Sequence, residues 1–228
     1  MQIFGCTLSD GQTQDDVWAL ADAFAANAAT MNNPDDASGL FLWIPYRGAT
    51  PYDFAFGVLS GDLNSMAAGS AAYQASAGAA AIGARFQAMD GCDSAIMMSD
   101  QISEGKIGMT AGDRIPDAVV ETFSCNINDG SDMDDWNGAV KFYQDQVAKI
   151  DSAALNQYQA YQWTPFRGGT GAEIVWVGNS PDLKTWAQGE TDYANSAAGQ
   201  AADDRFAKVS TCTNNLWMGY WLVTPEEF

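Results

Sequence analysis

Apolar residues recur at helical spacing through the segment 14–31. They stand three or four positions apart, so they would share one face of a helix; they are Val17, Leu20, Ala21, Phe24, Ala28 and Met31. A turn at Asp10–Gly11 precedes the segment, and Thr13 is the candidate N-cap. The pattern predicts an amphipathic helix that buries one face.

The residues that follow alternate in the manner of strands. Phe41 and Trp43 lie on one face of a predicted strand over 40–45, and a second strand is predicted over 53–59. A helix that glycines interrupt is expected from Ser60 to about Met89, and a last strand over 94–98. The order β-α-β-β-α-β is the ferredoxin-like, split βαβ arrangement.

The same pattern returns 119 or 120 positions later. The segment 4–11 (FGCTLSDG) aligns with 123–130 (FSCNINDG), and 43–50 (WIPYRGAT) aligns with 163–170 (WTPFRGGT). The second copy repeats the helical stripe with Trp136, Ala139, Val140, Tyr143, Val147 and Ile150, caps it with Asp132, and predicts strands over 160–165, 173–178 and 214–222. We interpret the chain as a tandem duplication with repeats at 1–104 and 120–228, joined by a linker at 105–119.

The passage 173–184 (EIVWVGNSPDLK) is a strand that runs into a helix with Pro181 in its first turn. It resembles the dimeric α/β-barrel superfamily, and the likeness in pattern extends over both copies. The resemblance implies an α+β fold in which two ferredoxin-like units pack sheet to sheet, here as a pseudo-dimer within one chain. Some members are cofactor-independent monooxygenases that use Trp, Tyr, Asn and Arg side chains, but no catalytic residue can be carried over.

Each copy contains two cysteines at equivalent positions. In the expected topology the first and last strands of a unit are antiparallel neighbours, so the most economical of three pairings is Cys6–Cys92 with Cys125–Cys212. Such bonds would indicate an oxidising compartment. Four free thiols in a cytoplasmic protein are the alternative, and metal binding is a weaker one because no C-x-x-C pair occurs.

The charge and the missing histidine exclude several classes of function. The formal charge is −19, from 23 Asp and 6 Glu against 10 basic residues, which disfavours nucleic acid and anionic membranes as partners. The chain has no histidine, which removes Ser-His-Asp and Cys-His catalysis and histidine-ligated metal or haem. We find no cofactor motif, no calcium-loop spacing and no stretch apolar enough to span a membrane.

Candidate binding residues come in matched pairs. Structural ion pairing is the favoured explanation of Arg47 and Arg167, which follow the Trp-x-Pro turns. The functional interpretation is that they present a guanidinium to an anionic ligand. The aromatic candidates for a small apolar ligand are Trp43, Trp163, Tyr73 and Tyr193, for which core packing is the alternative. Arg85 and Arg205 are expected to form structural salt bridges.

These observations favour an exported, acidic protein that binds a small molecule or a partner and whose leader has been removed. The oligomeric state is left open. A monooxygenase-like enzyme is the first alternative. A structural or assembly subunit is the second, and an exposed sheet edge would support it.

Overall fold

A computed structural model describes residues 1–31, 39–105, 107–108, 110–112, 114–169 and 171–224. The first half contains β1 (Gln2–Thr7), α1 (Gln14–Ala28), β2 (Leu40–Gly48), β3 (Phe54–Val58), α2 (Leu63–Ala75), α3 (Ala79–Gln87) and β4 (Gly91–Gln101). The second half contains β5 (Ala118–Ile127), α4 (Met133–Val147), a 3-10 turn η1 (Leu155–Gln157), β6 (Gln159–Gly168), β7 (Ile174–Ser180), α5 (Leu183–Ala194), α6 (Ala197–Val209) and β8 (Ser210–Val223).

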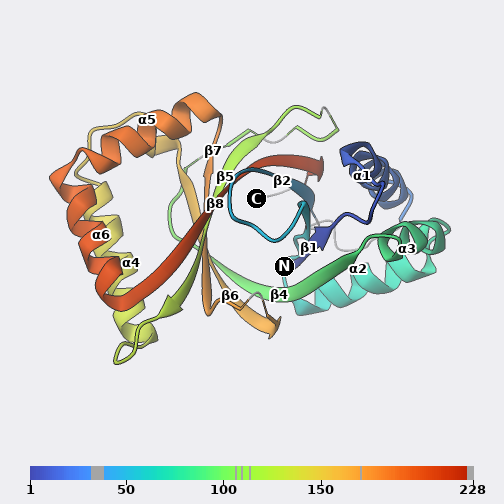
Figure 1. Ribbon diagram of the computed structural model, residues 1–228, viewed down its shortest axis with the longest axis horizontal. Helices are drawn as coiled ribbons and strands as arrows, with labels where there is room; N and C mark the ends of the chain where they lie inside the picture. The colour runs from blue at the N-terminus through green and yellow to red at the C-terminus, as the bar shows by residue number, and fades with distance from the viewer. Residues whose placement is uncertain (32–38, 106, 109, 113, 170, 225–228) are drawn as a thin grey trace.

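The eight strands close into one antiparallel barrel in the order β1-β3-β2-β8-β5-β7-β6-β4. Figure 1 shows the barrel at the centre of the molecule, with α1–α3 and α4–α6 at opposite ends. The expectation of two open sheets stacked face to face therefore needs correction, because β2 pairs with β8 and β4 pairs with β6 along their edges. Closure satisfies the N–H and C=O groups that open edges would leave unpaired. Each strand thus has a neighbour on both sides, and the described strands offer none of the free edges that an assembly subunit would use.

Bulges accompany the edge pairing. The register shifts in β2 between Leu40 and Phe41 and again between Pro45 and Arg47, and in β4 between Ile96 and Met97. Bulges bend a strand and increase its twist, which helps two sheets curve toward each other. The predicted strands over 40–45 and 94–98 are consequently longer in the structure, ending at Gly48 and Gln101, since these extensions make the contacts between the halves.

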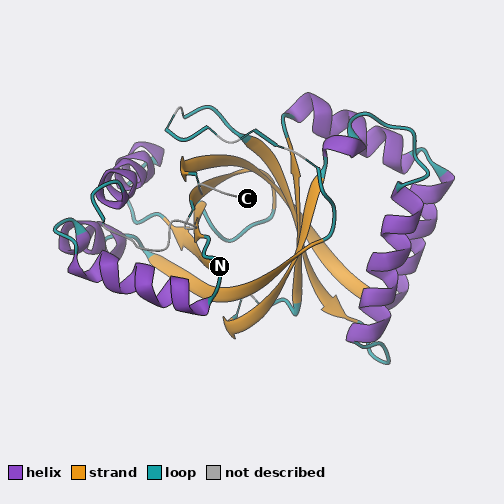
Figure 2. Cartoon of the chain, turned by 180° about the vertical axis from the view of Figure 1, so that it is seen from behind, coloured by secondary structure: helices purple, strands orange, loops and turns teal. Residues whose placement is uncertain are grey.

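The helices cover two opposite outer faces of the barrel, as the view from behind also shows (Figure 2). Asp132 caps α4 by accepting hydrogen bonds from the backbone N–H groups of Asp134 and Asp135. The helices α2 and α5 begin after Asp62 and Asp182, whose carboxylates accept from the N–H groups of Ser65 and Thr185. None of the described helices is long and apolar enough to cross a bilayer.

The interior of the barrel is packed with side chains from both halves. Trp43 and Trp163 are 7% and 5% exposed and stack with their ring centroids 5.4 Å apart and their planes at 5°. Val120, Val175 and Trp217 belong to the same cluster. The barrel is therefore a solid core, and space for a ligand must be sought outside it.

Disulfides join the first and last strands of each half. Cys6 bonds to Cys92 across the β1–β4 ladder, and Cys125 bonds to Cys212 across the β5–β8 ladder. This confirms the predicted pairing. Two disulfides also fit an extracytoplasmic location, where such bonds persist.

Candidate functional site: a cavity under helices α4 to α6

A cavity of about 510 Å³ lies between the outer face of β5, β7 and β8 and the helices α4, α5 and α6. This volume falls within the range of about 300–1,000 Å³ that is usual for small-molecule sites. Its lining residues are Glu121, Phe123, Cys125, Trp136, Tyr143, Leu155, Tyr158, Trp176, Glu190, Tyr193, Ala194, Asp203, Phe206, Ala207, Ser210, Cys212 and Asn214. The cavity thus belongs wholly to the second half of the chain.

Strand alternation supplies the sheet side of the cavity. Along β5, Glu121, Phe123 and Cys125 line the cavity, while Val120 packs in the barrel core and Thr122 accepts a hydrogen bond from the barrel residue Trp217. Successive side chains of a strand point to opposite faces of the sheet, so every second residue reaches the helices. The position of Glu121 in this alternation places a carboxylate against the helical layer.

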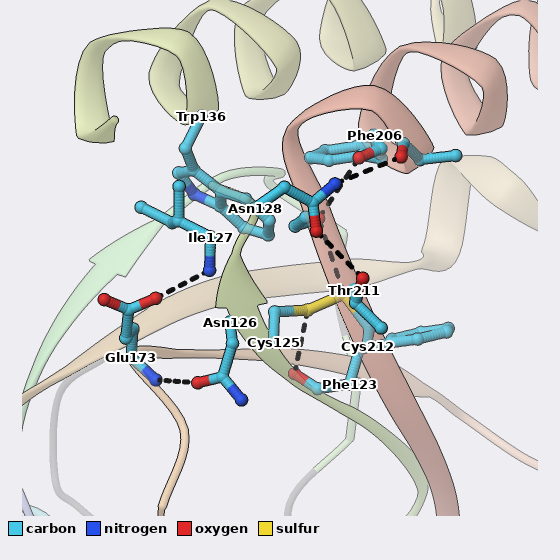
Figure 3. Close-up of a disulfide and its surroundings, with 12 residues drawn as sticks. Phe123, Cys125, Asn126, Ile127, Asn128, Trp136, Glu173, Phe206, Thr211 and Cys212 are labelled. Carbon is cyan, nitrogen blue, oxygen red and sulfur yellow. Dashed lines mark hydrogen bonds between the residues drawn. A yellow bond between two sulfur atoms is a disulfide. The ribbon is translucent and has the colours of Figure 1, made fainter. Parts of the chain in front are cut away.

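The disulfide Cys125–Cys212, shown in Figure 3, is formed by two residues that line the cavity. In this view Trp136 and Phe206 lie on its helical side, and their ring centroids are 5.1 Å apart. Asn128 donates to the carbonyl oxygens of the α6 residues Ala207 and Lys208 at 3.3 and 3.2 Å and accepts from Thr211 at 2.8 Å. These bonds fix the C-terminal end of α6 to the sheet, so this part of the cavity wall is held rigidly.

Aromatic rings form the walls. The ring centroid of Tyr143 lies 5.0 Å from that of Trp176, 6.1 Å from that of Tyr193 and 6.2 Å from that of Phe206. Tyr143 and Trp176 meet edge to face at 80°. These packed rings supply an aromatic surface to the cavity that all four residues line.

Tyr158 enters the cavity over a glycine of the neighbouring strand. A Cβ atom added to Gly178 would overlap the Tyr158 hydroxyl, so the residue at this point of β7 has to lack a side chain. The hydroxyl accepts a hydrogen bond from the indole N–H of Trp176 at 3.3 Å. Gly178 therefore positions a buried phenol at the floor of the site.

Three carboxyl groups line the cavity beside these rings. Glu121 is 4% exposed and accepts hydrogen bonds from Asn214 at 2.6 Å and from the indole of Trp186 at 3.4 Å. Asp203 accepts from the hydroxyl of Tyr193 at 2.8 Å. The third is Glu190, and no lysine or arginine is among the described residues that line the cavity. The site is negatively charged and has no internal counter-ion.

Burial and charge repulsion change the ionisation of Glu190, and burial that of Glu121 and the tyrosines. Burial, followed by the charges of Glu121 and Asp203, raises the pKa of Glu190 to about 7. Burial also raises the pKa of Glu121, although the hydrogen bonds from Asn214 and Trp186 oppose that rise. The pKa values of Tyr143, Tyr158 and Tyr193 are raised, chiefly by burial, so all three are neutral phenols at physiological pH.

The structure distributes the six predicted ligand residues among different places. Tyr193 lines the cavity, whereas Trp43 and Trp163 fill the barrel core. Tyr73 packs on α1 of the first half, with its ring stacked on Phe24 at 5.7 Å. Arg47 and Arg167 lie on the exposed ends of β2 and β6 and are not among the residues that line the cavity.

The structural salt bridges expected of Arg85 and Arg205 do not form within the described residues, where the ion pairs are Arg114–Asp22 and Lys141–Asp145. Arg85 instead donates a hydrogen bond to the carbonyl oxygen of Ala19 at 2.9 Å, tying α3 to α1. The guanidinium of Arg205 lies beside Gly138 of α4. Both side chains thus reach toward a neighbouring helix, α1 for Arg85 and α4 for Arg205. The described chain also contains no group of three or more acidic or sulfur ligands arranged for a metal ion.

Sequence reasoning missed the polar residues of the cavity. Glu121 replaces Gln2 of the first copy, Glu190 replaces Ser70 and Asp203 replaces Gly83 at the aligned positions. Tyr143 was predicted only as a member of the buried helical stripe, where the first copy has Phe24. The usable signal was this set of polar replacements at positions that the alignment pairs, because packing a core does not require carboxylates at these positions.

No protein-family model and no curated protein matches the sequence. Solved structures do resemble the fold. A protein from Fusobacterium nucleatum proposed to be a monooxygenase has a TM-score of 0.64 at 10% identity, over 96% of this chain and 90% of that one. One from Lactobacillus acidophilus, also proposed to be a monooxygenase, has a TM-score of 0.60 at 9% identity, over 97% and 94%. A heme-binding protein from Thermus thermophilus has a TM-score of 0.50 at 9% identity, over 96% and 90%. The chain has the dimeric α/β-barrel fold, and identities this low establish the fold alone.

Proposed function

We propose that the protein binds a small organic molecule in the cavity between the second-half sheet and helices α4–α6. One observation carries the proposal: a cavity of about 510 Å³, partly open to solvent, is lined by aromatic rings and a few polar groups. The barrel interior offers no comparable candidate because Trp43, Trp163 and Trp217 pack there.

The test is to fill the rim of the cavity. Ala207 is exposed on α6 and lines the cavity, so Ala207→Trp should obstruct it without loss of a buried contact. The matched control is Gln87→Trp, at the aligned and likewise exposed end of α3. Fragments that bind the wild-type protein in ligand-observed NMR should lose binding to Ala207→Trp and keep it to Gln87→Trp. Native mass spectrometry of protein from its natural source would show a co-purifying ligand directly. Fragment binding unaffected by Ala207→Trp would contradict the proposal.

Haem does not fit this cavity. Protein ligands to haem iron are His, Cys, Met or Tyr; the chain has no histidine, and both cysteines of the cavity are bonded to each other. The raised pKa values of Tyr143 and Tyr158 oppose the phenolate form that would bind iron. The carboxylates of Glu121 and Glu190 would also repel the haem propionates. We therefore propose no reaction that depends on haem.

A second candidate function is catalysis, and it is favoured by Glu190. A carboxyl group whose pKa is raised to about 7 inside a cavity is suited to accept or donate a proton near neutrality. Two structures of similar fold are proposed to be monooxygenases, which adds to this candidate. If the protein is an enzyme, a bound compound should change mass during aerobic incubation, and Glu190→Gln should slow that change. A compound recovered unaltered from the wild-type protein would leave binding as the function.

Two proposals from the sequence also gain support. The halves contain strands, helices and disulfides in the same order, which supports tandem duplication with repeats at 1–104 and 120–228. The two disulfides support export, with a periplasmic or secreted location. Export is tested by fractionating source cells: the protein should occur, with its four cysteines oxidised, outside the cytoplasm.

A further inference from the structure

We infer that the ligand of this cavity is an organic cation, an alkyl or aryl ammonium whose charged nitrogen lies at Glu121, Glu190 and Asp203 and whose apolar body lies between the aromatic walls. The inference rests on the proposed binding function and narrows it to one chemical class. The inference follows from three observations: the cavity is lined by three carboxyl groups, no cationic side chain lies among its described lining residues, and the remaining wall is aromatic.

The carboxylates come from three separate elements. Glu121 lies on β5, Glu190 on α5 and Asp203 on α6, and each charge lies close enough to Glu190 to disfavour its ionisation. Neutral donors satisfy Glu121 and Asp203 in part, namely Asn214, Trp186 and Tyr193. Hydrogen bonds from neutral donors leave the net charge in place, so the group lacks a cation.

Two polar groups of the wall make no hydrogen bond to the described residues. They are the carboxylate of Glu190 and the hydroxyl of Tyr143, and both residues line the cavity and are half-buried. A ligand that filled the cavity would bury both groups, and buried polar groups are normally paired. A ligand that donates hydrogen bonds would pair both groups, and an ammonium nitrogen has such donors.

The aromatic walls select the same class. A cation over the face of Trp or Tyr gains about 0.5–2 kcal/mol, and the gain is larger where water is excluded. The rings of Tyr143, Trp176 and Phe206 surround the cavity beside the carboxylates. The carboxylates would repel an anionic ligand, such as the one suggested by Arg47 and Arg167. A neutral ligand would leave the buried carboxylate of Glu121 without a counter-charge.

The shape of the site favours an organic rather than a metal cation. The described residues contain no group of carboxylates close enough together to bind a metal ion, so Glu121, Glu190 and Asp203 leave room for a larger charged group. Near the disulfide the lining includes the rings of Trp136 and Phe206. A molecule with a charged head and an apolar body matches this combination.

Binding should depend on pH through Glu190. The titratable groups that face it are Glu121 from β5, Tyr143 from α4, Tyr158 ahead of β6, Tyr193 from α5 itself and Asp203 from α6. The tyrosines stay neutral because their pKa values are raised, so below pH 7 the main change is protonation of Glu190. Affinity for a cation should therefore fall as pH decreases through 7.

The experiment uses three probes of similar size on the whole protein: 3-phenylpropylammonium, 3-phenylpropanol and 3-phenylpropionate. At pH 8 the cation should bind at least about tenfold more tightly than the alcohol by calorimetry, since about 1.4 kcal/mol corresponds to a factor of ten. Glu190→Gln should weaken binding of the cation by about tenfold and leave the affinity for the alcohol unchanged. Wild-type affinity for the cation should fall by a similar factor between pH 8 and pH 5.5.

The outcomes that would contradict the inference differ from those that would contradict the proposed function. If the alcohol or the propionate binds as tightly as the cation and Ala207→Trp abolishes that binding, the cavity is a site but its ligand is not a cation. If Ala207→Trp leaves cation binding intact, the cation binds elsewhere and the inference is wrong. Tighter binding of calcium than of 3-phenylpropylammonium, lost in Glu190→Gln, would also overturn it in favour of a metal site. If none of the three probes binds at pH 8, the inference is overturned, and the fragment screen separately decides the proposed function.

Discussion

The helical layers at the two ends of the barrel are built on aligned residues but enclose different interiors. In the first half the rings of Phe24, Phe56, Tyr73 and Phe86 pack together, with Phe24 lying 5.6, 5.7 and 5.9 Å from the other three. The aligned rings of the second half are Tyr143, Trp176, Tyr193 and Phe206, at 5.0, 6.1 and 6.2 Å from Tyr143. The aromatic frame is thus shared.

The two halves differ in the volume and the charge of the side chains beside these aromatic rings. Leu20 and Ile82 are 0% and 2% exposed in the first-half core, and the aligned residues of the second half are Ala139 and Ala202. Carboxylates occur at Glu121, Glu190 and Asp203 only in the second half. A few changes of volume and polarity therefore distinguish a packed layer from a candidate binding site while the fold is unchanged.

The largest expected effect is common to both halves. Loss of either disulfide, in Cys6→Ala/Cys92→Ala or Cys125→Ala/Cys212→Ala, should lower the free energy of unfolding by about 4 kcal/mol, because the bonds close loops of nearly equal length, 86 and 87 residues. Urea denaturation measures the loss. Only the second double variant should also weaken ligand binding at permissive temperature, because Cys125 and Cys212 line the cavity. Equal weakening in both would mean that the halves are not independent at the site.

Exchange of one hydroxyl sharpens the comparison. Phe24→Tyr would place a hydroxyl within the aromatic cluster of the first half and should cost about 1–2 kcal/mol of unfolding free energy. Tyr143→Phe should change stability by less than about 0.5 kcal/mol, because its hydroxyl has no hydrogen-bond partner within the described residues. Chemical denaturation of the two variants provides the measurement. A larger loss for Tyr143→Phe than for Phe24→Tyr would show that the second-half hydroxyl has a structural role.

The smallest effect is electrostatic. Because the pKa of Glu190 is raised to about 7, the folded protein retains a proton between the ordinary value of 4.5 and about 7 that the unfolded chain has released. Stability should therefore fall as pH rises through this window. Glu190→Gln removes that dependence and should be about 1 kcal/mol more stable than wild type at pH 8, after allowance for solvent screening, with no difference near pH 4.

Thermal unfolding from pH 4 to pH 8 measures this effect. Ser70→Glu is the matched control, since Ser70 is the aligned and exposed position of the first half, and it should not add a comparable dependence. If wild type and Glu190→Gln show the same dependence of stability on pH, Glu190 is not the group whose pKa is raised.

The sequence alone was enough to predict the order of helices and strands, the two disulfides and the dimeric α/β-barrel fold. These features depend on local periodicity and on the positions of Cys6, Cys92, Cys125 and Cys212, which two aligned copies display twice. Only the tertiary structure decided that the sheets join at β2–β8 and β4–β6, since edge pairing depends on how far each sheet twists and bends. Tertiary packing also placed Trp43 and Trp163 in the core and brought Glu121, Glu190 and Asp203 together from three elements. A cavity is a difference between the volume that a backbone encloses and the volume that its side chains fill, and no periodicity along the chain encodes that difference.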